Sequence, residues 1–355
     1  MAGYRLDRLS ILLVEDSEFI RNLLFSVLRS MEVGHIHTAR DGAEAIEFLK
    51  SRARLGMPGQ GPVDLIISDL IMPNMDGAML LRWVRRHEES PDRFMPFIMI
   101  SGAVDRDRVA AIRDLGVSEF LAKPFTVRAI ATHLQAAIEN PRPFIYTQDY
   151  FGPDRRRTDQ PISGEDQRSP DKSKIAVVYT ARSLRSAPAD ARAWMFRLPN
   201  RLKDKVLAFG GSTAGGIDPE LLKAAEMQVK QMADDYADWV RSYVTQLQAS
   251  HKQAVEDPPK AFLQLGEMNQ VAHELRGQGA TFGYPLITTF GRSLHEYTTL
   301  ERDVTDVSPE LLELIKAHID GIRAVMAEKV KGDGGAIGKE LVRMLNLAVK
   351  KYKGG

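Results

Sequence analysis

Several residues that could perform chemistry in this 355-residue chain stand directly after short apolar runs. Asp69 follows the run 63–68 and precedes a turn rich in proline and glycine. Glu15 and Asp16 follow the run 10–14 in the same way. An acid in this position either works at the rim of a sheet or caps the next turn. Whether these acids have a chemical role or a capping role depends on which other residues lie at the same rim.

Two further polar residues mark the ends of other apolar runs: Ser101 closes the run 97–101, and Lys123 lies just past 117–121. Three carboxylates at one rim would repel one another unless a cation lay among them. Oxygen ligands suit Mg²⁺, which keeps water and phosphate oxygens in its remaining positions. With a hydroxyl and an ammonium group nearby, the set predicts a phosphoryl-transfer pocket in which Asp69 is the nucleophile.

One histidine in the C-terminal half has neighbours suited to phosphoryl chemistry. His273 has Arg276 at i+3 and Gly277 at i+4, so the three share one helix face. A neutral imidazole is a nucleophile near neutral pH, and a nearby cation steadies the phosphorylated product. Gly277 costs about 1 kcal/mol relative to alanine in a helix interior, so we expect it to leave room for another protein's loop. The alternative is an ordinary surface histidine, and the other histidines, such as His295 and His318, lack these neighbours.

The N-terminal half alternates short β-type runs with helical patterns. The runs cover 10–14, 33–38, 63–68, 97–101 and 117–121, and helical patterns begin near Ser17, Gly42, Gly77, Asp105 and Thr126. Such βα units with nearly all-apolar strands predict an α/β fold with a doubly wound, five-stranded parallel sheet covered by helices on both faces. Right-handed crossovers place all the carboxyl ends on one side, which brings the polar residues together.

The rest of the chain predicts a linker and then an all-α region. Prolines interrupt the stretch 141–217, where we expect no regular element before a strand-like run at 174–180 and an apolar segment at 191–207 that packs on one of the domains. A helix start at Pro219 opens the region 218–352, with further helical patterns at 260–282, 285–301, 309–330 and 336–352. We expect an antiparallel bundle of four or five helices.

Composition narrows the function classes. A formal net charge of +1 gives no global field for nucleic acid or an anionic membrane, and the lack of cysteine removes disulfides and thiolate sites. No apolar run is long enough to span a bilayer, so we expect a cytoplasmic protein without membrane or nucleic-acid partners. The glycine string 332–340 departs from a P-loop at Asp333 and Glu340, so we expect a protein without an ATP-binding kinase domain.

Residues 8–140 resemble the flavodoxin-like receiver domain of bacterial two-component response regulators. The matching motifs are VED at 14–16, DLIMPNMDG at 69–77, SG at 101–102 and FLAKPF at 120–125. The resemblance implies that a sensor histidine kinase phosphorylates Asp69. It also implies that Mg²⁺ is bound by Glu15, Asp16, Asp69 and the carbonyl of Ile71. Ser101 and Lys123 would contact the phosphoryl group, and Phe120 would be a switch aromatic. The alternative for Phe120 is a permanent place in the core without a switch role, and the alternative for Lys123 is an ordinary exposed lysine on a turn.

The stretch AHELRGQGATFG at 272–283 resembles the histidine phosphotransfer (HPt) domain. The resemblance implies that His273 accepts a phosphoryl group, that Arg276 and Gly277 support it, and that transfer occurs between Asp69 and His273 within or between chains. Downstream receiver or HPt proteins would be further partners. Arg276 stands where lysine is commoner, and Gln278 where a small hydroxyl residue is frequent. The alternative is a receiver-controlled binding module in which His273 is inert, and the sequence sets neither the direction of transfer nor the oligomeric state.

Overall fold

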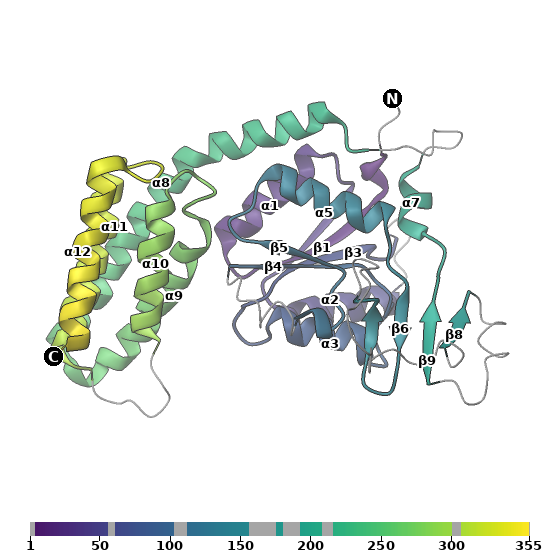
Figure 1. Ribbon diagram of the computed structural model, residues 1–355, viewed down its shortest axis with the longest axis horizontal. Helices are drawn as coiled ribbons and strands as arrows, with labels where there is room; N and C mark the ends of the chain where they lie inside the picture. The colour runs from purple at the N-terminus through teal and green to yellow at the C-terminus, as the bar shows by residue number, and fades with distance from the viewer. Residues whose placement is uncertain are drawn as a thin grey trace, which may run out of the picture. The chain divides into compact units, whose positions relative to one another are not determined.

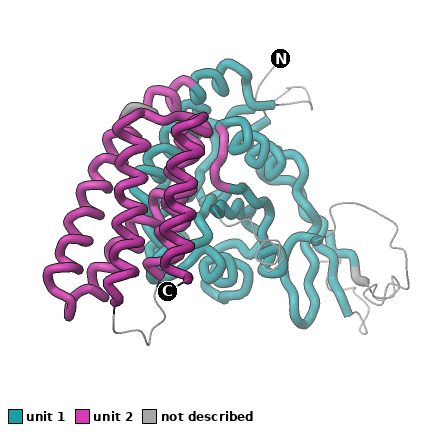
Figure 2. The backbone as a smooth tube through the Cα atoms, turned by 60° about the vertical axis from the view of Figure 1, so that its left-hand side comes forward, with its two compact units in different colours: residues 1–122, 127–226 teal, residues 123–126, 227–355 magenta. Residues whose placement is uncertain are grey.

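The computed structural model describes residues 4–55, 61–102, 112–155, 175–179, 192–207, 216–299 and 307–354. The chain divides into two compact units (Figure 2). Unit 1 comprises Met1–Ala122 and Val127–Glu226, and unit 2 comprises Lys123–Thr126 and Met227–Gly355.

A five-stranded parallel sheet forms the centre of unit 1, in the order β2-β1-β3-β4-β5 (Figure 1). Its strands are β1 (Ser10–Val14), β2 (His35–Ala39), β3 (Leu65–Asp69), β4 (Phe97–Ser101) and β5 (Glu119–Ala122). Every residue of β1, β3 and β4 is buried, as expected for strands covered on both faces. The edge strand β2 is largely exposed or half-buried. The predicted five-stranded parallel sheet is confirmed.

Helices cover both faces of this sheet, with α1 and α5 on one face and α2 and α3 on the other (Figure 1). They are α1 (Glu18–Ser30), α2 (Gly42–Leu55), α3 (Gly77–Arg86) and α5 (Val127–Glu139), and a short 3-10 helix, η1 (Leu6–Arg8), precedes β1. Side-chain caps fix two of the starts, because Ser17 accepts the N–H of Ile20 and Asp76 accepts the N–H of Met79. The start of the helix predicted near Asp105 lies outside the described residues.

A second sheet follows α5, and it corrects the prediction that no regular element occurs soon after residue 141. Its strands are β6 (Phe144–Tyr146), β7 (Phe151–Pro153), β8 (Ile175–Val178) and β9 (Ala193–Phe196), in the order β7-β6-β9-β8. The prolines were misleading because they flank the strands: Pro143 precedes β6, and Pro153 ends the edge strand β7, where a missing N–H is tolerated. β9 and the following helix α7 (Arg201–Val206) account for the described part of the apolar segment 191–207, which belongs to unit 1 and packs there through the contact of Phe196 with Phe94.

Unit 2 is largely helical, as predicted. Its elements are most of α8 (Pro219–Glu256), the 3-10 helix η3 (Pro258–Lys260), α9 (Ala261–Gln278), α10 (Pro285–Thr298), α11 (Pro309–Ala327) and α12 (Gly335–Gly354). Proline at the first position opens α8, α10 and α11, where its missing N–H has no helical partner to lose.

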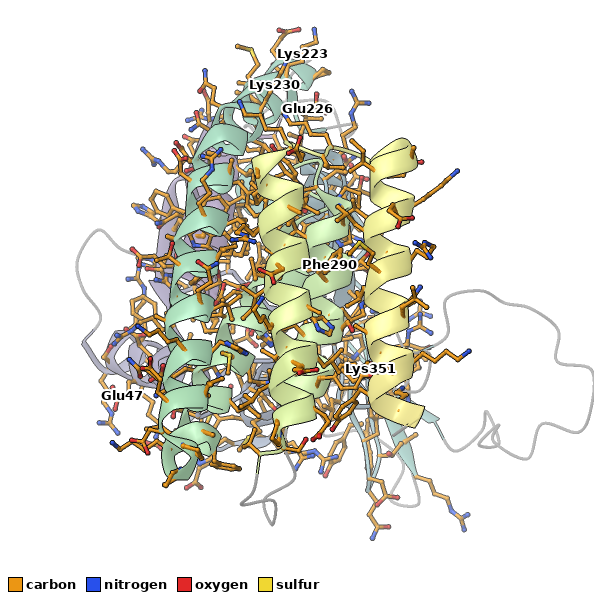
Figure 3. All side chains as sticks on the ribbon, turned by 90° about the vertical axis from the view of Figure 1, so that its left-hand side faces the viewer. Glu47, Lys223, Glu226, Lys230, Phe290 and Lys351 are labelled. Atoms are coloured by element: carbon orange, nitrogen blue, oxygen red, sulfur yellow. The ribbon has the colours of Figure 1, made fainter. Side chains whose placement is uncertain are left out.

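The helices of unit 2 pack in chain order, α9 against α10, α10 against α11 and α11 against α12. Figure 3 shows Phe290 among these helices, and its side chain is 1% exposed with the ring directly against Gly321 of α11. Within the described ranges, no helix combines the length and the apolar character needed to cross a membrane.

Candidate functional site

Asp69 is the last residue of β3. The sequence predicted that this strand would end one residue earlier, at Ser68. Its side chain is buried, and Oδ1 accepts a 2.7 Å hydrogen bond from the N–H of Leu70. The chain returns to the same point at Gly77, where an added Cβ would lie 2.1 Å from the carbonyl oxygen of Asp69. Glycine therefore lets α3 begin directly against the strand end that carries Asp69.

Glu15 and Asp16 follow β1, the neighbour of β3 in the sheet. Glu15 is 1% exposed and Asp16 is half-buried. Arg21 donates from Nη1 to the backbone carbonyls of both residues, at 2.7 and 3.1 Å, and so fixes the backbone of this turn. The cap of α1 is Ser17, so neither acid serves as the side-chain cap of that helix.

The donor set at this edge fits a hard divalent cation. A carboxylate oxygen of Asp16 and one of Asp69 lie within 4.8 Å of each other. Two carboxylates this close repel unless a cation neutralises them, and Mg²⁺ binds oxygen at about 2.1 Å, so one ion could contact both. Ile71, whose carbonyl is the fourth predicted ligand, lies two residues past β3 and is half-buried.

The other predicted pocket residues lie in or next to β4 and β5. Ser101 is the last residue of β4, is 1% exposed, and ends the strand that pairs with β3. Lys123 directly follows β5 and is grouped with unit 2. Phe120, in β5, is half-buried and packs against the core of unit 1. Partial burial agrees with both alternatives for Phe120, so its switch role stays a prediction.

His273 lies on α9, half-buried, with Arg276 one turn further along. Arg276 donates a 2.9 Å hydrogen bond from Nη2 to His273 Nδ1. Burial, and after it the positive charge of Arg276, lowers the pKa of His273 to about 3. The imidazole is therefore neutral near pH 7. Among the described residues, the nearest atom outside the helix's own backbone lies 3.9 Å from a Cβ built on Gly277, so tight packing does not explain the glycine there.

A second histidine joins this site, and sequence reasoning missed it. Arg276 donates from Nη1 to His295 Nδ1 at 3.2 Å, so one guanidinium holds two imidazoles whose ring centres are 5.7 Å apart. His295 was set aside because threonines occupy its i+3 and i+4 positions, where His273 has an arginine and a glycine. The partner comes from α9, and the available signal was Gly291 one turn earlier: a Cβ there would lie 2.7 Å from the backbone nitrogen of Arg276.

His295 is itself fixed by side chains of α9 and α10. Asn269 donates to the carbonyl of His295 at 3.1 Å and to the hydroxyls of Thr298 and Thr299 at 3.0 and 2.9 Å. Burial, followed by the charge of Arg276, lowers the pKa of His295 to about 4. Both imidazoles thus accept from Arg276 through Nδ1, which assigns the single proton of each neutral ring to Nε2.

Comparison with known proteins identifies the sheet-containing region. Residues 11–135 match the family model described as "Response regulator receiver domain". The chain is 28% identical over 131 residues to Chemotaxis protein CheY-3 of Vibrio cholerae, which covers 37% of this chain and 92% of that protein. Chemotaxis protein CheY of Pseudomonas aeruginosa is also 28% identical over 131 residues, covering 37% of this chain and 97% of that protein.

A third relative is Sensor kinase CckA of Brucella abortus, 35% identical over 133 residues, which cover 37% of this chain and 12% of that kinase. The family match ends before the second sheet and the helices of unit 2. A receiver domain implies interaction with histidine kinases or phosphotransfer proteins. Residues 11–135 of this chain are therefore a response regulator receiver domain, homologous to CheY-like regulators and indicative of two-component signalling.

Proposed function

We propose that this protein is a cytoplasmic phosphorelay protein in which Asp69 and His273 exchange a phosphoryl group, within one chain or between chains. A sensor histidine kinase supplies the phosphoryl group to Asp69, and further receiver or HPt proteins are the downstream partners. The protein itself transfers the group and does not bind ATP as a kinase. The proposal rests on the receiver match for the aspartate step and on the Arg276–His273 hydrogen bond for the histidine step.

At the aspartate step, Glu15, Asp16, Asp69 and the carbonyl of Ile71 would hold Mg²⁺, which neutralises charge on the phosphoryl oxygens when bound. The Leu70 N–H orients the carboxylate of Asp69 by holding Oδ1. A carboxylate oxygen attacks phosphorus, and the bond from phosphorus to the donor breaks. Ser101 and Lys123 contact the transferred group in this proposal, the former through its hydroxyl and the latter through its ammonium.

At the histidine step, a ring nitrogen of His273 attacks the phosphorus of the Asp69 phosphoryl group. The bond from phosphorus to the Asp69 oxygen breaks, and the carboxylate leaves with the bonding electron pair. A low pKa keeps the imidazole neutral and therefore nucleophilic at neutral pH. Arg276, fixed in place by His295, provides a positive charge beside the phosphohistidine.

The same hydrogen bond also favours a second candidate, the receiver-controlled binding module with an inert histidine. Because Arg276 donates to Nδ1, the proton of the neutral ring is on Nε2, and Nε2 has no lone pair for attack. Attack through Nε2 requires Arg276 to withdraw and the proton to move to Nδ1 by exchange with water. In the binding-module alternative, Arg276 never withdraws, and phosphorylation of Asp69 changes only what the helices of unit 2 bind.

Phosphosite mapping of the full-length chain separates the two candidates. The wild-type protein, Asp69→Asn and His273→Gln are each treated with Mg²⁺ and a small acyl phosphate, and both sites are mapped at neutral to mildly alkaline pH, where phosphohistidine survives. The relay requires phosphate on Asp69 and His273 in the wild type and no phosphohistidine in Asp69→Asn. His273→Gln should retain phosphate on Asp69 for longer, because its outlet is gone.

Phosphate on Asp69 alone, with the same lifetime in wild type and His273→Gln, supports the binding module and rejects the relay from aspartate to histidine. The same samples incubated with a histidine kinase that phosphorylates Asp69 extend the test to the physiological class of donor. A protein that acquires phosphate at neither site under both treatments would contradict the whole proposal.

A further inference from the structure

A cavity of about 1120 Å³ lies in unit 1 at the end of the parallel sheet opposite to Asp69. Its lining includes Asp64 and Pro96, which directly precede β3 and β4, whereas Asp69 is the last residue of β3. The other wall is formed by the segment from β9 to α7, residues 196–202. Pockets for small molecules typically measure about 300–1,000 Å³, so this cavity has room for an organic ligand.

Aromatic rings form the apolar part of the wall. The ring centres of Phe94 and Phe144 are 5.1 Å apart, and those of Phe94 and Phe196 are 5.4 Å apart. Leu198 also lines the cavity and is 44% exposed, which leaves a large apolar side chain in contact with water. A flat apolar ligand that covered these side chains would bind more tightly the more apolar surface it removed from water.

The charged part of the wall is strongly positive. The charged lining residues are Arg52, Arg142, Arg197, Arg201 and Lys205 against Asp64 and Asp92. Lys205 and Asp64 neutralise each other across 2.6 Å. The guanidinium groups of Arg197 and Arg201, which flank Leu198 and Pro199, form no hydrogen bond or ion pair with any residue in the described ranges. Within the part of the chain that the structure describes, two cations without a partner thus lie beside an apolar surface.

A further positive charge lies beneath the aromatic wall. The side chain of Arg85 is 1% exposed, and its guanidinium carbon lies 5.2 Å from the ring centre of Phe144. Nε and Nη1 donate to the carbonyls of Gly116, Arg93 and Met95, whereas Nη2 has no hydrogen-bond partner in the described part of the chain. Because backbone carbonyls carry no net charge, these bonds leave the charge of Arg85 in place near the cavity.

We propose that this cavity binds a small amphipathic anion, namely a flat aromatic or apolar body that carries a carboxylate, sulfonate or phosphate group. The body packs against Phe94, Phe144 and Phe196, and the anionic group is bound by Arg197 and Arg201. Guanidinium groups suit this role because their planar array of donors matches the oxygens of such anions. The inference is independent of phosphoryl transfer, since the cavity and Asp69 lie at opposite ends of β3.

Two fluorescent probes that differ in one anionic group test the proposal on the full-length chain. 8-Anilinonaphthalene-1-sulfonate carries the sulfonate, and N-phenyl-1-naphthylamine is its neutral counterpart. We expect the sulfonate probe to bind at one site per chain and more tightly than the neutral probe. The double variant Arg197→Gln/Arg201→Gln should weaken binding of the sulfonate about five- to tenfold, as expected for partly exposed charge-assisted contacts, and leave the neutral probe unchanged.

Matched variants locate the site. Arg192→Gln removes an exposed arginine that directly precedes β9 and does not line the cavity, so it should leave both affinities unchanged. Leu198→Trp narrows the cavity and should weaken both probes, with circular dichroism used to verify that the fold is intact. The proposal is overturned if neither probe binds, if the double variant binds the sulfonate normally, or if Arg192→Gln weakens it as much as the double variant does.

Discussion

The pocket around Asp69 and the site around His273 present their reactive groups in different ways. In the receiver domain the backbone positions the chemistry, because Asp69 and Ser101 are the last residues of neighbouring parallel strands. On α9 the side chains do so, because Arg276 reaches from one turn away to His273 and across to His295 on the next helix. A site made by strand ends can be deduced from the order of the chain. A site made by side chains on two helices requires knowledge of which helices touch.

Removal of Mg²⁺ should produce the largest difference between the Asp69 pocket and the His273 site. Mg²⁺ is predicted to act only at the carboxylates, so chelation should reduce phosphorylation of Asp69 by an acyl phosphate to background, a loss of at least about a hundredfold. Asp16→Asn should raise the Mg²⁺ concentration needed for half-maximal phosphorylation about tenfold or more. The measurement is incorporation of phosphate as a function of Mg²⁺ concentration.

Asp76→Asn is the matched control for this experiment. Asp76 lies in the loop between β3 and α3, close in sequence to Asp69, but it caps α3, and asparagine caps a helix as well as aspartate does. Unchanged Mg²⁺ dependence in Asp16→Asn, or an equal effect in Asp76→Asn, would contradict the ligand set. Chelation after phosphorylation should leave any phosphohistidine intact.

Close approach of α9 and α10 is the next feature to test. Gly291→Ala would place a Cβ 2.7 Å from the backbone nitrogen of Arg276, so we expect the free energy of unfolding to fall by about 1–3 kcal/mol. Gly266→Ala lies on the exposed surface of α9, where the new Cβ meets no described residue within 4 Å, and it should raise the free energy of unfolding by up to about 1 kcal/mol. Denaturant unfolding measures both. Equal effects of the two substitutions would show that the helices do not approach closely at Gly291.

A pH titration followed by NMR tests the neutral state of His273. Its pKa of about 3 lies below the ordinary 6.5, so we expect its ring signals to stay constant between pH 8 and 5. Arg276→Met should raise the pKa by about one unit but leave it below 6.5, because burial is the larger cause. The unfolded chain binds this proton more tightly than the folded chain does. The free energy of unfolding should therefore decline as the pH falls below 6.5. A His273 that titrates near 6.5 in the wild type would refute the assignment.

The smallest expected effect concerns His295. His295→Phe removes one acceptor of Arg276 and should lower the free energy of unfolding by about 1 kcal/mol, because the guanidinium loses a hydrogen bond in a half-buried site. The NMR signals of His273 should also shift, because Arg276 links the two rings. If His295 contributed only to overall stability, the signals of His273 would stay unchanged. His87→Phe, on the surface of unit 1, is the control and should leave His273 unchanged.

The sequence allowed the parallel sheet to be predicted in detail because its signals are local. β1 and β4 occupy the predicted residues, and the ends of β2, β3 and β5 differ by one or two positions. The strand-like run predicted at 174–180 contains β8, but β6 and β7 of the second sheet were missed because their rings pack against Phe94, some fifty residues away, and nothing in the stretch from Pro141 shows that partner. His295 was missed for the same reason, since its partner Arg276 lies on another helix. The assigned roles of the pocket residues and of His273 stay predictions.

The second sheet has a consequence for how this receiver can be exchanged between proteins. Phe144 and Phe151 pack against Phe94, and Phe144 covers the guanidinium of Arg85. A gene fusion that excised the receiver after Asn140 would leave an aromatic surface and a buried cation without their cover. The transplantable module of this chain is therefore longer than the family match, and a recombination event that preserved its folding would carry the following sheet with it.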